Sequence, residues 1–374
     1  MEPRRTLKAK VTTARARRSA VPSRRFHLAR TTDYVPHKER KSAAAIGRLL
    51  DTLASLFRAI ASRFPRREHV KDGHGPYGPY RLRERIGTGG MGEVYLAEHV
   101  LLKRPCAIKL IRPGRAAEPK VLARFEREVR ATARLSHENT VTIHDYGRTG
   151  DGTLYYVMEY LPGLNFAELV ERYGPLPPGR VIHLIRQACR ALREAHDEGL
   201  IHRDIKPANL FAAKRGGRFD VTKLLDFGLV KPTSASPGLP VHHSRDGVIS
   251  GSPLYMSPEQ ATGAVADLRS DLYALGAVAY FLLTGQPPFP GENAIKVMLA
   301  HMHDKVPAPS RFLPGIPEDL ERVVLRCLAK GPADRFPDAE GLELALAACT
   351  DAGHWSFAHA ARWWIDREGN NLLQ

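Results

Sequence analysis

The stretch Ile201–Asn209 constrains the fold most, because it combines an acid, a base and a proline in one short segment, Ile-His-Arg-Asp-Ile-Lys-Pro-Ala-Asn. Pro207 cannot continue a helix, so we expect Asp204 to lie on a loop. Asn209 offers an amide oxygen, and Asp226 supplies a carboxylate after the length of a short hairpin. Hard oxygen ligands beside a lysine suit Mg²⁺ held against a phosphate. The stretch therefore predicts phosphate chemistry on a loop.

A glycine-rich turn, residues 87–92, lies between two stretches of alternating apolar and polar residues. We expect strands over 81–86 and 93–97, and therefore a hairpin. The glycines of a dinucleotide-binding motif must open a helix, so the hairpin argues against that motif. Residues without Cβ let backbone amides close over phosphate oxygens. The spacing alone is a weak signal in a chain with 31 glycines.

The next segment predicts the remainder of a small sheet. Residues 106–110 form an expected strand with Lys109 among apolar neighbours, and a helix over 121–135 offers Glu128 as its partner. A further strand, 154–160, ends at Leu161-Pro162-Gly163, an expected hinge. The chain is then mainly helical, with helices expected over 181–198, 270–283, 293–303, 317–329 and 338–349.

Positive charge is concentrated near the N-terminus. The chain has a formal net charge of +16, and residues 1–79 hold 19 Lys and Arg against 6 Asp and Glu. Residues 1–42 have few large apolar groups, so we expect disorder there. Residues 43–63 repeat apolar side chains at helical spacing with Arg between them, which predicts an amphipathic basic helix. Three interpretations stay open for it: packing on the body or a partner, contact with an anionic membrane surface, and nucleic-acid contact.

The cysteines and the hydropathy favour a cytoplasmic protein. Four cysteines stand far apart, which suggests neither a zinc site nor a disulfide framework and fits a reducing compartment (Cys106, Cys189, Cys327, Cys349). No apolar run reaches the ~18–20 residues that cross a bilayer. We therefore expect no transmembrane segment and a cytoplasmic location, with peripheral membrane association through the basic helix as an alternative.

Taken in order, these motifs resemble the eukaryotic-like (Hanks-type) serine/threonine protein kinases of bacteria, over about residues 80–350. The kinase motif set stands here as Gly87–Val94, Lys109, Glu128, His202–Asn209, Asp226-Phe227-Gly228 and Ser257-Pro258-Glu259. The resemblance implies an α+β, two-lobed kinase fold. A small antiparallel β lobe with helix C would span 80–160, and a mainly helical large lobe would span 161–350. Residues 1–79 would be an extension and 351–374 an aromatic tail.

The resemblance also implies roles for individual residues. Asp204 would orient the substrate hydroxyl and accept its proton, and Lys206 would neutralise charge on the transferred phosphoryl group. Lys109, held by Glu128, would grip the ATP phosphates, while Asn209 and Asp226 would hold Mg²⁺, with Mn²⁺ as an alternative ion. The nucleotide would be bound by the glycine loop, an apolar pocket and the hinge (Ile86, Gly87, Gly89, Gly92, Val94, Ala107, Met158, Glu159, Leu161, Phe211).

Regulatory and structural residues follow from the same resemblance. Arg203 adjoins Asp204, so an anion in the activation segment, 226–259, could order that segment through Arg203. Ser244 is our favoured phosphorylation site, and Ser252 stands where threonine is usual. Glu259 is expected to pair with Arg335, and Asp271 to anchor the catalytic loop.

The predicted activity is transfer of the γ-phosphoryl group of ATP to Ser/Thr hydroxyls of proteins, including autophosphorylation, in bacterial signal transduction. Self-association and contact with an anionic surface through residues 1–70 are further expected modes. A catalytically silent nucleotide-binding scaffold is the alternative from another class. For the aromatic tail two interpretations stay open: packing on the large lobe, or docking of a partner.

Overall fold

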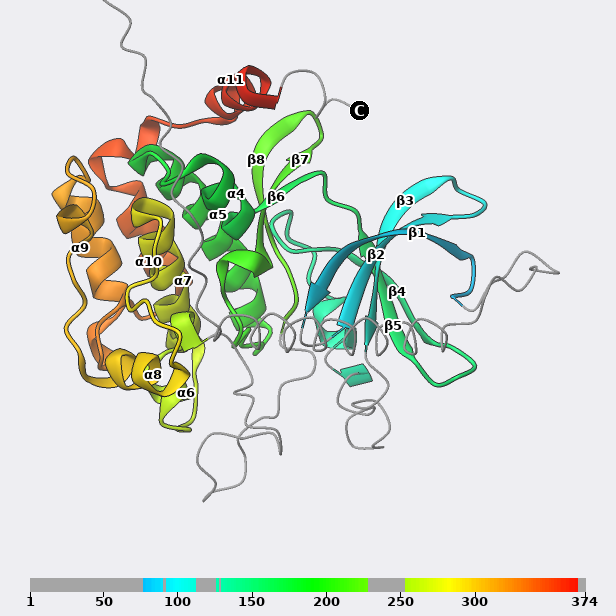
Figure 1. Cartoon of the computed structure of the whole chain (residues 1–374), viewed down its shortest axis with the longest axis horizontal. Helices are drawn as coiled ribbons and strands as arrows, with labels where there is room; N and C mark the ends of the chain where they lie inside the picture. The colour runs from blue at the N-terminus through cyan, green and yellow to red at the C-terminus, as the bar shows by residue number, and fades with distance from the viewer. Residues whose placement is uncertain (1–76, 90–91, 112–125, 128, 228–252, 369–374) are drawn as a thin grey trace, which may run out of the picture. The chain divides into compact units, whose positions relative to one another are not determined.

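The computed structural model describes residues 77–89, 92–111, 126–127, 129–227 and 253–368 (Figure 1). The predicted helix over 43–63, Glu128, Ser244 and Ser252 lie outside the described residues. Residues 126–127 and 129–132, on either side of Glu128, are helical. No helix in the described part of the chain is both long and apolar enough to span a membrane.

Five strands form an antiparallel sheet in the order β1-β2-β3-β5-β4 (Figure 1). Their bounds are β1 Tyr80–Gly89, β2 Gly92–His99, β3 Arg104–Ile111, β4 Ile143–Arg148 and β5 Leu154–Glu159. The hairpin predicted around the glycines is confirmed, since Gly89 pairs with Gly92 where β1 meets β2. A Cβ at Gly92 would stand 1.7 Å from the Leu110 carbonyl oxygen, so close approach of β3 requires glycine there.

The register of β3 against β5 decides which side chains meet. Lys109 lies directly opposite Tyr156 in this antiparallel pair. Opposed residues project from the same face of a sheet, so the two side chains are neighbours. The adjacent Tyr155 projects from the other face, where it packs edge-on against Tyr77 with ring centroids 5.5 Å apart.

A second, three-stranded antiparallel sheet in the order β6-β7-β8 follows the hinge. It comprises β6 Gly163–Asn165, β7 Leu210–Arg215 and β8 Arg218–Leu224. The β7–β8 hairpin connects Asn209 to the segment that carries Asp226, as the sequence predicted. A parallel bridge between Thr140 and Leu224 joins the segment before β4 to the end of β8.

The large lobe is built around two helices that are buried over much of their length, α5 Pro178–Asp197 and α7 Leu268–Thr284. Asp267 caps the start of α7 by accepting a hydrogen bond from the Arg269 amide, and Gly285 ends it in the left-handed conformation. The α7 sequence is apolar almost all round, as expected for a helix inside a core.

Shorter elements surround these two helices. They are α4 Phe166–Tyr173, α6 Pro258–Ala261, α8 Ala294–His303, α9 Glu318–Cys327, α10 Ala339–Ala347 and α11 Phe357–Glu368, with 3₁₀ turns at Pro207–Asn209, Pro253–Tyr255, Pro309–Arg311, Pro332–Asp334 and Thr350–Gly353. The five predicted helices correspond to α5, α7, α8, α9 and α10 within a few residues at each end. Neither α4, which begins with a capping box from Asn165 and Glu168, nor α6 was predicted.

Helix α11 packs beside the β7–β8 hairpin (Figure 1). Trp364 is only 2% exposed, and its indole Nε1 donates to Asp220 of β8 at 2.8 Å. Trp355 Nε1 donates to the same carboxylate at 3.0 Å. Of the two interpretations of the aromatic segment, packing on the large lobe is the one the structure shows for residues 355–368.

Candidate active site

The backbone of the catalytic loop is fixed by Asp271, in the first turn of α7. Its carboxylate accepts hydrogen bonds from the His202 and Arg203 amides, both at 2.8 Å. His196 Nε2 lies 2.9 Å from the same carboxylate. Asp271 is 1% exposed, so these contacts compensate for burial of the carboxylate. The predicted anchoring of the loop by Asp271 is confirmed.

His202 connects the catalytic loop to the Asp-Phe-Gly segment. Its Nε2 lies 2.7 Å from the Leu225 carbonyl oxygen, and its Nδ1 accepts from the Asp204 amide at 3.2 Å. Burial of the ring lowers the pKa of His202, which favours a neutral imidazole that donates from Nε2 and accepts at Nδ1. The His202 ring also packs against Phe227, with centroids 4.7 Å apart.

Asp204 lies between two polar side chains of its own loop. Lys206 Nζ donates to Asp204 Oδ2 at 3.1 Å, and Asn209 Nδ2 approaches the same oxygen at 3.3 Å and the Asp204 carbonyl oxygen at 2.8 Å. Asp204 is 9% exposed. The loop thus brings together three of the residues predicted for the reaction, with a cation next to the carboxylate.

Asp226 accepts hydrogen bonds from two side chains of the first sheet. Lys109 Nζ donates to Asp226 Oδ2 at 2.6 Å, and the Tyr156 hydroxyl donates to Asp226 Oδ1. Burial alone would raise the pKa of Asp226, but the Lys109 charge and the two hydrogen bonds hold that pKa below its ordinary value. The expected partner of Lys109 was Glu128, which lies outside the described residues. The partner that the structure shows is Asp226.

Asn209 and Asp226 are chemically suited to hold a hard cation. Within the described part of the chain the Asn209 side chain hydrogen-bonds through its amide nitrogen, so its carbonyl oxygen is the atom suited to bind a cation. Asp226 is ionised and has two carboxylate oxygens, each with more than one acceptor direction. An amide oxygen and a carboxylate are ligands that Mg²⁺ accepts.

Four of the residues predicted to surround the nucleotide base belong to one apolar cluster of the small lobe. Ala107 and Met158 are buried in this cluster, and Val94 and Leu161 pack against it. Leu225, which precedes Asp226, packs against the same cluster and was not predicted. Ile86 on β1 is exposed and Phe211 on β7 is half-buried, and neither belongs to the cluster.

Glu159 was predicted to contribute backbone groups at the hinge, but its side chain has a structural role of its own. Its carboxylate accepts from Lys223 Nζ at 2.6 Å and from the Thr142 amide at 3.0 Å, and Arg215 Nη2 lies 3.1 Å away. Glu159 and Lys223 are both almost fully buried, so each compensates the charge of the other. The pair ties the end of β5 to β8.

The segment that ends the activation region is held on both sides. Arg335 donates two hydrogen bonds to Glu259, each at 2.8 Å, which confirms the predicted pair. Gln260 Nε2 donates to the Arg203 carbonyl oxygen at 3.1 Å. This contact, which was not predicted, fixes the start of α6 next to the catalytic loop.

The Arg203 guanidinium has one buried nitrogen, Nε, whose hydrogen bond is not made within the described part of the chain. The Arg203 backbone has φ +62°, a conformation that non-glycine residues seldom adopt. The Arg203 amide donates to Asp271 and the Asp204 amide donates to His202 Nδ1, and these two contacts hold the backbone in this position.

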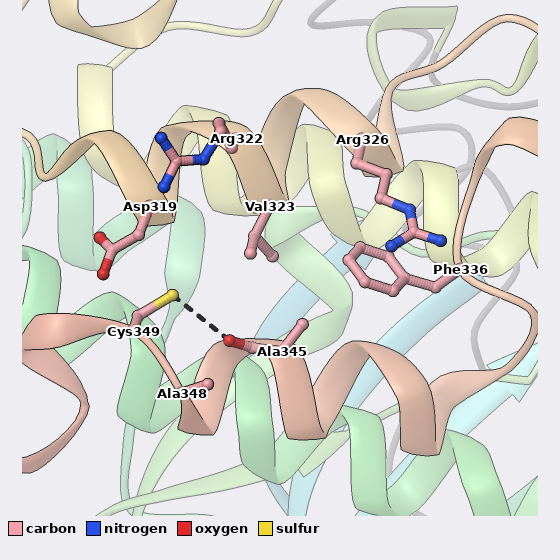
Figure 2. A pocket seen from close by; sticks show the side chains of 8 residues that line it. All are labelled: Asp319, Arg322, Val323, Arg326, Phe336, Ala345, Ala348 and Cys349. Carbon is pink, nitrogen blue, oxygen red and sulfur yellow. Dashed lines mark hydrogen bonds between the residues drawn. The ribbon is translucent and has the colours of Figure 1, made fainter.

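A surface cavity of about 350 Å³ lies between α9 and α10 (Figure 2). Its lining comprises Asp319, Arg322, Val323, Arg326, Phe336, Ala345, Ala348 and Cys349. Arg326 lies over the Phe336 ring, and Asp319 accepts from Thr350. Burial raises the pKa of the Cys349 thiol to about 11, and the thiol donates to Ala345 (Figure 2). A protonated thiol is a poor nucleophile, so Cys349 is not suited to nucleophilic catalysis.

Residues 80–344 match the family model described as the protein kinase domain. The chain is 40% identical over 271 residues to the serine/threonine-protein kinase pkn3 of Myxococcus xanthus, which covers 72% of this chain and 49% of that relative. It is 38% identical over 275 residues to PrkC of Bacillus subtilis, which covers 74% of this chain and 41% of that protein. The chain therefore spans less than half the length of these relatives.

Solved structures agree with the sequence relatives. The crystal structure of the PknI kinase domain from Mycobacterium tuberculosis matches with a TM-score of 0.58 at 30% identity, and the match covers 76% of this chain and 100% of that one. The motifs, the α+β arrangement of the lobes and these matches agree with one another. The chain therefore belongs to the protein kinase family, among the bacterial serine/threonine kinases that its motifs resemble.

Proposed function

We propose that this chain is a serine/threonine protein kinase that transfers the γ-phosphoryl group of ATP to protein hydroxyls. One observation carries the proposal: the Asp204 carboxylate lies next to Lys206 and Asn209 on a loop that Asp271 fixes. Phosphoryl transfer asks the protein mainly for positioning and charge neutralisation, and this loop offers both. The relatives are named serine/threonine-protein kinases, which supports the same activity.

Asp204 orients the acceptor hydroxyl and takes up its proton in this proposal. Lys206, with Nζ 3.1 Å from Asp204 Oδ2, contributes positive charge beside the transferred group. Lys109 supplies a second positive charge on the side of Asp226. A bound Mg²⁺, or Mn²⁺ in its place, would neutralise phosphate charge between Asn209 and Asp226.

The hinge and the glycine turn bind the nucleotide in this proposal. The base lies against Ala107, Met158 and Leu161, and the backbone at Glu159 and Leu161 supplies hydrogen bonds to it. The ion pair between Glu159 and Lys223 supports this role, since it holds the hinge backbone against β8. Protein hydroxyls, including those of the chain itself, are the proposed acceptors.

Arg203 is the proposed receptor for a phosphate on the activation segment. The buried Nε, which has no partner among the described residues, supports this role, because a phosphate oxygen would satisfy it through a charge-assisted hydrogen bond. Ser244 remains the predicted phosphorylation site, and Ser252 remains a predicted regulatory residue. The proposed role is in bacterial signalling, and the proposed location is the cytoplasm. Self-association of the chain is also proposed. Residues 1–70 are proposed to contact an anionic surface, on the basis of their positive charge.

The proposal is tested by transfer of radiolabelled γ-phosphate from Mg-ATP to the chain itself and to a generic basic protein. The matched variant is Asp204→Asn, which keeps the shape and loses the basic carboxylate. We expect wild type to label Ser and Thr, and the variant to transfer phosphate at least roughly 100-fold more slowly, the lower range for loss of a catalytic base. Equal rates would refute the role of Asp204. Nucleotide binding without transfer by wild type would favour the scaffold alternative.

A further inference from the structure

We propose that Tyr156 is a positioning residue for Asp226: its hydroxyl, together with Lys109, fixes the carboxylate in the orientation that binds the divalent cation of the nucleotide complex. This inference rests on the proposed function, because it assigns Asp226 to the metal. It adds a residue that the kinase motif set does not contain, on a strand that the sequence marks only as apolar.

The geometry starts from the pairing of two strands. Lys109 on β3 and Tyr156 on β5 are directly opposed, so both side chains leave the sheet on the same face. Lys109 Nζ lies 5.9 Å from the centroid of the Tyr156 ring. Each side chain reaches a different oxygen of Asp226: Lys109 donates to Oδ2 and Tyr156 to Oδ1. Two donors on two oxygens fix both the position of the carboxylate and the rotation of its plane.

The surroundings of the hydroxyl suit this role. Tyr156 is almost fully buried, and its hydroxyl donates to Asp226 Oδ1. Each carboxylate oxygen of Asp226 can accept one hydrogen bond and still offer a lone pair to a cation. The hydroxyl therefore orients the ligand and leaves it able to bind.

Lys109 alone would hold the carboxylate less firmly. A lysine side chain has four rotatable bonds, and its ammonium group can donate hydrogen bonds in many directions. A tyrosine in a packed sheet has two side-chain torsions, so its hydroxyl occupies a defined position. Outer-shell hydrogen bonds of this kind typically change metal affinity by roughly 10–100-fold when they are removed.

The test compares Tyr156→Phe with wild type in nucleotide binding rather than in turnover. Calorimetry would measure the Kd of a non-hydrolysable ATP analogue once in EDTA and once in saturating Mg²⁺. We expect the Kd of the variant in EDTA to stay within about 2-fold of the wild-type Kd. The factor by which Mg²⁺ lowers the Kd should be roughly 10-fold smaller in the variant than in wild type. The matched control is Tyr155→Phe, which removes a hydroxyl from the same strand on the opposite face and should behave as wild type.

Each outcome decides the proposal. An unchanged or larger gain from Mg²⁺ in Tyr156→Phe would overturn it, since the hydroxyl would then be neutral to the cation or compete with it. If Tyr156→Phe fails to fold, Tyr156→Leu repeats the comparison, and failure of both overturns the proposal in favour of a folding role. If wild type itself gains nothing from Mg²⁺, the metal part of the proposed function fails, and this inference fails with it.

Discussion

The replacement of Asp220 by asparagine is the sharpest test of how the large lobe is held together. Asp220 Oδ1 accepts from Arg180 Nη2 and Trp364 Nε1, both at 2.8 Å. Its Oδ2 accepts from Arg180 Nε at 2.8 Å and Trp355 Nε1 at 3.0 Å. Asp220 and Arg180 are both 0% exposed. Asp220 has φ +54°, which asparagine also tolerates, so Asp220→Asn changes the charge and leaves the backbone unstrained.

The magnitude follows from the number of donors. An asparagine offers one oxygen, so in either orientation its NH₂ group faces one Arg180 nitrogen and one indole N–H. Two hydrogen bonds to a charged group, at about 1.5–3 kcal/mol each, are then lost. Loss of the partner of a buried charge gives a similar range, about 3–5 kcal/mol. We expect the free energy of unfolding to fall by about 4 kcal/mol, although the ring faces of the tryptophans still contact Arg180.

Urea denaturation measures this change. All three tryptophans of the chain, Trp355, Trp363 and Trp364, contact Arg180, so their fluorescence reports on the cluster directly, while circular dichroism reports on the lobe. Coincident transitions would justify a two-state analysis. The control is Glu318→Gln, which breaks an ion pair of 2.6 Å between side chains that are 64% and 83% exposed. We expect less than about 1 kcal/mol there, because water screens the pair. Equal effects at the two sites would refute the reasoning.

Two further changes test the contacts around the site. Arg335 and a hydrogen bond from Ser270 lower the pKa of Glu259 to about 2 against the opposing effect of burial, so the pair stabilises the fold fully above the unfolded pKa of about 4.5. The stability difference between wild type and Glu259→Gln, from urea midpoints, should be constant above about pH 5 and shrink as the pH falls toward 2; a constant difference down to pH 3 would contradict the assignment. Gly92→Ala would bring a Cβ within 1.7 Å of a β3 carbonyl oxygen, whereas Gly87→Ala meets Val94 at 3.7 Å. Thermal melting should therefore show a large loss for Gly92→Ala and a small one for Gly87→Ala, and equal losses would count against the close approach.

The sequence contained enough to predict the catalytic loop, the glycine hairpin and the five longer helices α5, α7, α8, α9 and α10. Pro207 after Lys206 places Asp204 on a loop, and the glycine turn between alternating stretches requires a hairpin. These features depend on local chemistry. The helices predicted from such local patterns begin and end within a few residues of the predicted positions.

Contacts between distant segments were harder to predict. Tyr156 belongs to a strand that looks uniformly apolar, and its role depends on being opposite Lys109, which only the register determines. Glu159 is similar: a carboxylate at the end of a buried strand requires a cation, but no local pattern identifies Lys223 as that cation. In both cases the sequence shows a polar group within an apolar strand, but it does not show which residue binds that group.

The position of Trp364 also has a consequence for how the chain is made. The kinase match ends at residue 344, yet Asp220 receives one of its four donors from a residue 144 positions later in the chain. During synthesis, Arg180 and Asp220 emerge long before the indole that completes their enclosure. A chain cut after residue 344 would retain every kinase motif and leave the Arg180–Asp220 pair without its aromatic cover. The kinase motifs therefore end before residue 344, whereas the buried Arg180–Asp220 pair is fully enclosed only after Trp364 has been synthesised.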